Sequence, residues 1–276
     1  DRARDTGLWS LDLTAARALL HRVNAQAAPQ EPQADLAFYA LDGGQVLVHG
    51  EPVARWESSV AREMAFLFAA NPRGLRRDAI IEALWPESEP DKGNNLFHST
   101  LYRVRRALGA DAVVRIADRY AFDDALAVFY DAALFEELAT RALDQNGDAE
   151  ARRRALDLYH EPYLNWSELD WCYQQRERLR RMLREMLLIE AREQVDQQDT
   201  HAAEAAFTRL LQMDDLDERA YRGLMWCRYT RGDDAGAVRA YMQCRKALRR
   251  ELGVDPELAT RQMWDQIRHH ESLPRP

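Results

Sequence analysis

The chain has 276 residues, of which 46% are hydrophobic and 30% charged, with a net charge of −8. This length suits two or three domains of roughly 100–150 residues each. The apolar fraction excludes a wholly disordered or low-complexity protein, and no uncharged apolar run reaches the about 18 residues of a membrane span. The negative balance argues against a protein that coats nucleic acid over its whole surface. We expect a cytoplasmic protein, with no membrane partner, that is part of a longer chain.

The first 35 residues predict one helix and a linker. Apolar residues at helical spacing between Leu13 and Val23 predict an amphipathic helix in residues 1–24, which we assign to a module further upstream. Residues 25–35 follow, with prolines at 29 and 32 and no aromatic side chain. Such a composition is typical of a linker.

Residues 36–125 predict a winged helix-turn-helix domain of the α+β class. The expected elements are strands at 36–41, 45–50 and 51–53, helices from Ser58 or Ser59 to Asn71, at 76–85 and at 92–108, and strands at 113–116 and 120–122. Asp42-Gly43 between two apolar runs is a hairpin signal. In a winged helix the third helix enters the major groove of DNA, so the helix at 92–108 is the candidate recognition helix.

The predicted third helix separates an apolar face from a polar face. Phe97, Leu101, Val104 and Leu108 cluster on one arc at about 100° per residue. The opposite face holds the candidate DNA-binding residues Lys92, Asn95, Ser99, Tyr102, Arg103 and Arg106. Arginine can pair with guanine and asparagine with adenine, whereas the other side chains suit phosphates. No carboxylate lies between Lys92 and Gly109, so we expect this face to attract a duplex; a basic but merely solvated helix face is the alternative.

Three further arginines are candidate DNA contacts. Arg115 and Arg119 flank the second hairpin, where they can reach phosphates or a minor groove. Arg76 begins the second helix, and a helix N-terminus with an added cation can hold a phosphate. Ordinary strand-end solubility explains the hairpin arginines equally well.

Residues 126–276 predict an all-α domain, so the chain as a whole is mainly α. Gln198, Ala203 and Phe207 match Gly232, Ala237 and Tyr241 at a constant offset of 34, the period of tetratricopeptide repeats. The segment 147–159 is a candidate diverged copy. We interpret residues 144–148 as a turn between helices, since a calcium loop would require a spaced terminal glutamate.

Several sequence blocks resemble a known family. They are Leu84-Trp85-Pro86, residues 95–109, Asp131–Leu138, Trp171 with Glu177–Leu179, and Tyr241 with residues 247–257. The first two are similar to the OmpR/PhoB-type DNA-binding domain as it occurs in SARP-type bacterial activators. The others are similar to the bacterial transcriptional activator domain that follows it. Thr100 and Tyr102 depart from the usual third helix, so a base preference cannot be carried over.

The resemblance implies a transcription factor that binds direct repeats in promoter DNA, with a homodimer on DNA as one fitting arrangement, and recruits RNA polymerase. The loop between the second and third helices, residues 86–91, would then contact polymerase through Glu87, Glu89 and Asp91; a plain solvated loop is the alternative. The repeat domain would serve regulation or oligomerisation. Because other members carry sensor or ATPase modules, residues 25–35 are a candidate hinge to such a module.

The sequence predicts no catalytic or metal site and no cofactor. Gly-rich phosphate loops and Gly-x-Ser-x-Gly are absent from it, and its histidines lie in no metal-binding motif. Cys172, Cys227 and Cys244 lack the spacing of a zinc clip and are predicted to be buried thiols. Residues 51–120 hold 11 Lys/Arg and 10 Asp/Glu, a net of +1. The competing hypothesis is therefore a winged-helix and repeat module that binds proteins and no longer binds DNA.

Overall fold

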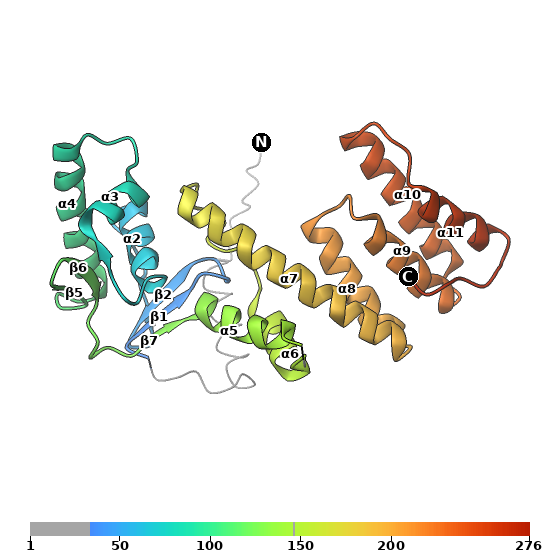
Figure 1. Ribbon diagram of the computed structural model, residues 1–276, viewed down its shortest axis with the longest axis horizontal. Coiled ribbons are helices and arrows are strands. Elements are labelled where there is room, and N and C mark those ends of the chain that lie inside the picture. Colours follow the sequence, from blue (N-terminus) through green and yellow to red (C-terminus); the bar gives the residue numbers. More distant parts are fainter. Residues whose placement is uncertain (1–33, 146) are drawn as a thin grey trace, which may run out of the picture. The chain divides into compact units, whose positions relative to one another are not determined.

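The computed structural model describes residues 34–145 and 147–276, so the helix and most of the linker expected before residue 34 lie outside the described residues. The described chain forms two compact units. One comprises residues 34–40 and 44–130, and the other comprises residues 41–43 and 131–276 (Figure 1). The elements of the first unit are β1 (Leu36–Tyr39), β2 (Gln45–Val48), β3 (Glu51–Pro52), α2 (Ser59–Ala69), β4 (Leu75–Arg76), α3 (Arg77–Leu84), α4 (Pro90–Leu108), β5 (Val113–Ile116), β6 (Arg119–Phe122) and β7 (Val128–Tyr130).

The first unit opens with a four-stranded sheet in the order β3-β2-β1-β7. The hairpin predicted at Asp42-Gly43 is confirmed, with Leu36 paired to Val48. The structure corrects one predicted boundary. Residues 126–130 are expected from the sequence to begin the helical domain, but Val128–Tyr130 form strand β7. Val128 pairs with Leu36 in parallel register, and the helices start at Asp131.

Helices α2, α3 and α4 enclose the core of the first unit. Ser58 caps α2 as predicted, since its side chain accepts a hydrogen bond from the amide of Ala61 at 3.2 Å. Phe38 of β1 contacts Phe66 of α2 and Phe122 of β6, with ring centroids 5.4 and 5.3 Å apart. The whole predicted apolar face of α4 is buried: Phe97, Leu101, Val104 and Leu108. This packing fixes which face of α4 points outward.

A three-stranded sheet, β4-β6-β5, follows α4. Strands β5 and β6 form the second hairpin predicted from the sequence, with Ile116 paired to Arg119. Ala117 at its tip has a φ of 55°, the left-handed conformation that a tight turn requires. Gly74 lies against this sheet: a Cβ there would come within 3.0 Å of the Tyr120 carbonyl oxygen, so glycine allows the close approach.

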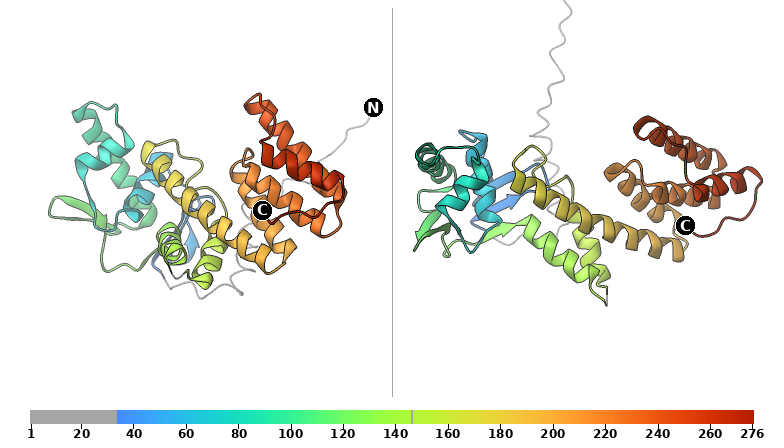
Figure 2. Two further views of the ribbon diagram at one scale, coloured as in Figure 1. Left: turned by 45° about the vertical axis from the view of Figure 1, so that its right-hand side comes forward. Right: turned by 45° about the horizontal axis from the view of Figure 1, so that its top comes forward.

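The second unit is helical. Its elements are α5 (Asp131–Leu143), α6 (Ala149–Leu158), α7 (Asp170–Asp196), α8 (Thr200–Met213), α9 (Glu218–Thr230), α10 (Asp234–Glu251) and α11 (Leu258–Arg268). The long helix α7 runs along α8, as Figures 1 and 2 both show. Arginines of α7 hold the surrounding loops, since Arg176 donates to the carbonyl oxygens of Tyr163 and Ser167 at 2.8 and 2.9 Å.

The repeat predicted at an offset of 34 is present in the backbone. Gln198 and Gly232 both have a positive φ, 62° and 80°, in the turns before α8 and α10. The next residues, Asp199 and Asp233, cap these helices, and each donates its amide to the residue five positions earlier at 2.9 Å. Two turns with the same conformation, cap and hydrogen bond confirm a helical repeat.

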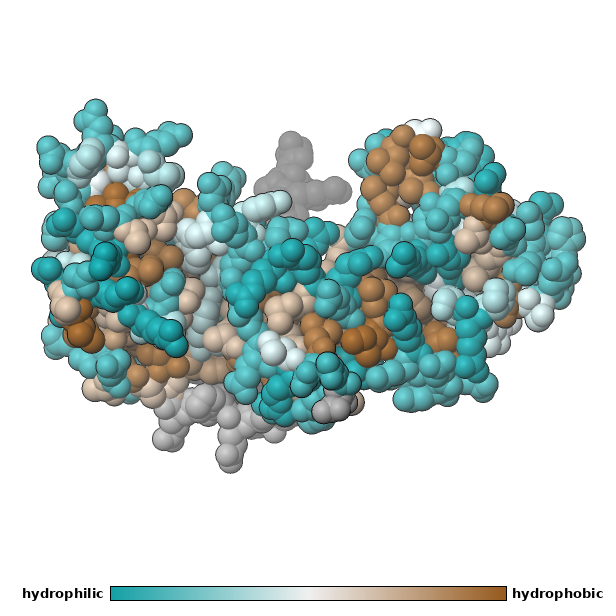
Figure 3. Space-filling view, in the orientation of Figure 1, coloured by the Kyte–Doolittle hydropathy of each residue, from teal (hydrophilic) through white to brown (hydrophobic). Residues whose placement is uncertain are grey.

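The remaining sequence predictions concern surface and thiols. All three cysteines are free and buried, as predicted. Among the described residues no helix is long and apolar enough to cross a bilayer. Large apolar side chains are exposed at the turn from α10 to α11: Leu252, Val254 and Leu258. Figure 3 shows an apolar patch on this part of the second unit.

Candidate nucleic-acid interface

Helix α4 presents one polar face over most of its length. Pro90 occupies its first turn, where a missing N–H costs nothing, so the helix starts two residues before the predicted Lys92. We call the outward set the α4 ridge: Lys92, Asn95, Ser99, Tyr102, Arg103 and Arg106. All are exposed except Arg103, which is partly buried. From Lys92 to Arg106 the ridge is about 21 Å long at roughly 1.5 Å per residue, a length that spans several base pairs.

A carboxylate faces the ridge, contrary to the expectation from the sequence. Glu57, in the loop before α2, lies 3.0 Å from the guanidinium of Arg106 and 3.9 Å from that of Arg103. Glu57 is 42% exposed, so the pairs are surface interactions. The helix itself carries no acid after Asp91, but the fold supplies one from 46 residues before Arg103. Any phosphate or base that approached these arginines would therefore compete with Glu57.

The other ridge side chains lie on the protein surface. Tyr102 is 62% exposed, and the Arg106 guanidinium lies over its ring at 5.8 Å, a cation–π contact that holds both side chains on the surface. Ser99 donates its hydroxyl to the carbonyl of Leu96 at 3.0 Å and retains acceptor capacity. Asn95 and Lys92 stand exposed nearer the start of the helix.

The three arginines predicted beside the ridge are held by the protein. Arg119 donates to the Gly74 carbonyl at 2.8 Å, and Arg115 donates to that of Ala117 at 3.0 Å. Arg76 pairs with Asp118 at 2.6 Å. The contacts of Arg119 and Arg76 join the hairpin to the segment that leads into α3, whereas the contact of Arg115 lies within the hairpin. All three arginines therefore have a structural role. Ile116, next to the hairpin tip, is an apolar residue that is 53% exposed.

The acidic loop is shorter than predicted. Glu87 and Glu89 are exposed in the loop between α3 and α4, whereas Asp91 lies in the first turn of α4. An acidic residue there is favourable next to the positive end of the helix dipole. Gly93 packs against the loop, since a Cβ would come within 2.9 Å of Ser88 Oγ. The loop is thus fixed on α4, with two carboxylates pointing outward.

Glu57 is the residue of this surface that sequence reasoning missed. It precedes the cap of α2 and lies outside every motif, so the only local signal is an acid next to a helix start. Its proximity to α4 depends on how α2 and α4 pack, which no short-range pattern reveals.

The chain is similar to one protein family and to individual known proteins. A family model described as bacterial transcriptional activator domain matches residues 130–268. Regulatory protein AfsR of Streptomyces coelicolor is 29% identical over 248 residues, covering 87% of this chain and 25% of the relative. Regulatory protein AfsR of Streptomyces griseus is 27% identical over 245 residues, covering 86% and 24%. The chain therefore spans about a quarter of the length of these relatives.

A solved structure shares the fold. Mycobacterium tuberculosis EmbR, in complex with a low affinity phosphopeptide, matches with a TM-score of 0.62 and 20% identity, covering 88% of this chain and 67% of that chain. The winged unit followed by helical repeats is thus an architecture already seen by experiment. The family model matches 139 residues, counted from 130 to 268, which is just over half of the 276. The chain therefore belongs to the family of the bacterial transcriptional activator domain, in agreement with its resemblance to SARP-type activators.

Proposed function

We propose that this chain is the part of a transcriptional activator that binds promoter DNA, with the α4 ridge in the major groove. The observation that carries the proposal is the division of α4 into a fully buried apolar face and a polar ridge. Arg103, Arg106 and Asn95 would read base edges, because forked or amide side chains match the donor and acceptor pattern of guanine and adenine. Lys92, Ser99 and Tyr102 would contact phosphates.

The arginines beside the ridge and the acidic loop extend the proposal. Arg115, Arg119 and Arg76 would approach the backbone next to the bound groove, after giving up or sharing their internal partners. Glu87, Glu89 and Asp91 would face a basic surface of RNA polymerase, because their carboxylates lie exposed at the start of α4. The helical repeats would support regulation or pairing of two copies on direct repeats. Sensor or ATPase modules in the rest of a longer chain would supply the signal.

Selection from a random duplex pool with the 276-residue chain tests the DNA-binding proposal. We expect an enriched motif, and we expect binding to weaken by roughly 1–3 kcal/mol for each of Arg103→Ala and Arg106→Ala. Arg261→Ala is the control, because Arg261 is an exposed arginine of α11 in the other unit. Affinity should also fall steeply with salt. No enrichment at low salt, or equal binding by the double variant, would overturn the proposal.

A module that binds proteins and no longer binds DNA is the second candidate. Two observations favour it. Arg76, Arg106 and Arg119 of the winged unit have partners within the protein, and residues 51–120 carry a net charge of only +1. This candidate predicts that no duplex is enriched from the pool and that the chain forms a stable complex with a protein. An enriched duplex motif would exclude it.

A further inference from the structure

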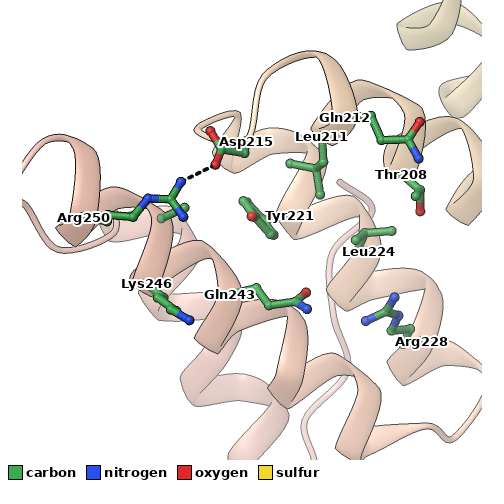
Figure 4. A pocket seen from close by; sticks show the side chains of 11 residues that line it. Thr208, Leu211, Gln212, Asp215, Tyr221, Leu224, Arg228, Gln243, Lys246 and Arg250 are labelled. Atoms are coloured by element: carbon green, nitrogen blue, oxygen red, sulfur yellow. Dashed lines mark hydrogen bonds and ion pairs between the residues drawn. The ribbon is translucent and has the colours of Figure 1, made fainter. Parts of the chain in front are cut away.

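The second unit contains a groove that the proposed function does not use. Its volume is about 470 Å³, within the roughly 300–1,000 Å³ typical of ligand pockets. Helices α8 and α10 form its two walls, and α9 lies between them (Figure 4). Leu211, Tyr221 and Leu224 give it an apolar floor. It is therefore a mixed surface, with an apolar base between two helical walls.

The walls are equivalent helices of successive repeats. Gln212 of α8 and Lys246 of α10 are separated by 34 residues and so occupy the same position in each repeat. Gln243 lies on the same wall as Lys246, as Figure 4 shows. All three side chains are exposed. The repeat thus places polar groups on both sides of the apolar floor.

Two of the three cations that line the groove are paired with carboxylates, and the third is not. Arg228 is paired with Glu204 at 2.7 Å, and Arg250 is paired with Asp215 at 2.8 Å. Lys246 has no ion pair or hydrogen bond from its side chain to any described residue, and the same holds for the amides of Gln212 and Gln243. An ammonium group with three donors and two amide groups are consequently free to bind a ligand.

We propose that this groove binds a short segment of a partner protein in which a carboxylate lies beside an apolar side chain. The carboxylate would pair with Lys246, the apolar side chain would cover Leu224 and Tyr221, and the two glutamine amides would bind the backbone of the segment. A nucleic acid fits less well, because Arg228 and Arg250 are already paired with carboxylates and the ammonium group of Lys246 alone cannot offset a row of phosphates. This proposal goes beyond the DNA-binding proposal and uses none of the α4 ridge.

Selection of a phage-displayed library of random dodecapeptides on the immobilised 276-residue chain tests this inference. We expect enriched peptides that carry Asp or Glu next to an apolar residue. Fluorescence anisotropy of one enriched peptide should show roughly tenfold weaker binding to Lys246→Glu, because an attractive pair is replaced by a repulsive one. Gln243→Trp should abolish binding by filling the groove, and its position is exposed, so folding is retained.

Arg261→Glu is the matched control, since it makes the same charge reversal at an exposed position of α11. Its affinity for the peptide should equal that of the wild type. The inference is overturned if no acidic peptide is enriched, or if enriched peptides bind Gln243→Trp and the wild type equally. It is also overturned if Lys246→Glu weakens binding of a random DNA duplex and leaves peptide binding unchanged. None of these outcomes depends on whether the α4 ridge binds DNA.

Discussion

Replacing Glu57 by glutamine tests how the fold restrains the α4 ridge. The substitution keeps the size of the side chain but removes the charge that lies 3.0 Å from Arg106 and 3.9 Å from Arg103. With Glu57 at 42% exposed and the arginines at 58% and 41%, each pair is a surface pair worth at most about 0.2–1 kcal/mol. Both arginines become more available to DNA, and the repulsion between the Glu57 carboxylate and phosphate is lost.

We therefore expect Glu57→Gln to bind a scrambled duplex about fivefold more tightly, equivalent to about 1 kcal/mol. The plot of log affinity against log salt should become steeper by about 0.9, because one more phosphate can be neutralised. Affinity for a selected motif should rise no more than affinity for the scrambled duplex, so specificity should not improve.

Anisotropy titrations of both duplexes between 50 and 200 mM salt, the range over which phosphate contacts show their salt dependence, measure these quantities. Glu51→Gln is the control, since Glu51 is an exposed glutamate on strand β3. Unchanged affinity and salt slope for Glu57→Gln, with the wild type binding DNA normally, would show that Glu57 does not restrain the ridge.

Three predictions concern the supporting structure. Gly93→Ala should lower the free energy of unfolding by about 1–3 kcal/mol in urea titrations, because its Cβ would lie 2.8 Å from Ile81 Cγ2. Asp131→Ala should lower the free energy of unfolding by about 1–3 kcal/mol, because the buried Asp131 carboxylate accepts a hydrogen bond from the backbone amide of Leu41 at 2.8 Å. Burial raises the pKa of Cys227 and Cys244 to about 12. Their neutral thiols therefore stabilise the fold fully below pH 9 and lose this effect as the pH rises from 9 towards 12; iodoacetamide should label them only after unfolding.

Periodicity in the sequence predicted which faces would be buried. The buried side of α4 follows from the helical spacing of its apolar residues. The matching turns before α8 and α10 follow from similar residues that recur 34 positions apart. Such patterns report the local preference of a helix and the period of a repeat, and packing did not override them. The packing that orients the α4 ridge could therefore be predicted from the sequence.

Long-range pairing was not accessible in this way. Strand β7 is three residues long and becomes a strand only by pairing with β1, about 90 residues earlier. Arg119 donates a hydrogen bond to the carbonyl of Gly74, which lies 45 residues earlier. Glu57 pairs with Arg106 because α2 packs on α4. The sequence shows that a residue is an arginine and therefore carries a charge. Whether its guanidinium is free to bind a ligand depends on which oxygen atoms the fold places next to it.

The distribution of lysine and arginine connects the two proposed surfaces. The sequence contains two lysines, Lys92 and Lys246, and neither pairs with a described residue. Arginine binds carbonyl and carboxylate oxygens through a rigid fork, so the arginines here serve largely internal contacts, while the lysines remain as mobile point charges. Acetylation by an amine-reactive reagent, read by mass spectrometry, can therefore report each surface separately. A selected duplex should protect Lys92 and leave Lys246 reactive, and an enriched acidic peptide should do the reverse. Protection of both lysines by the duplex alone would assign the groove to DNA.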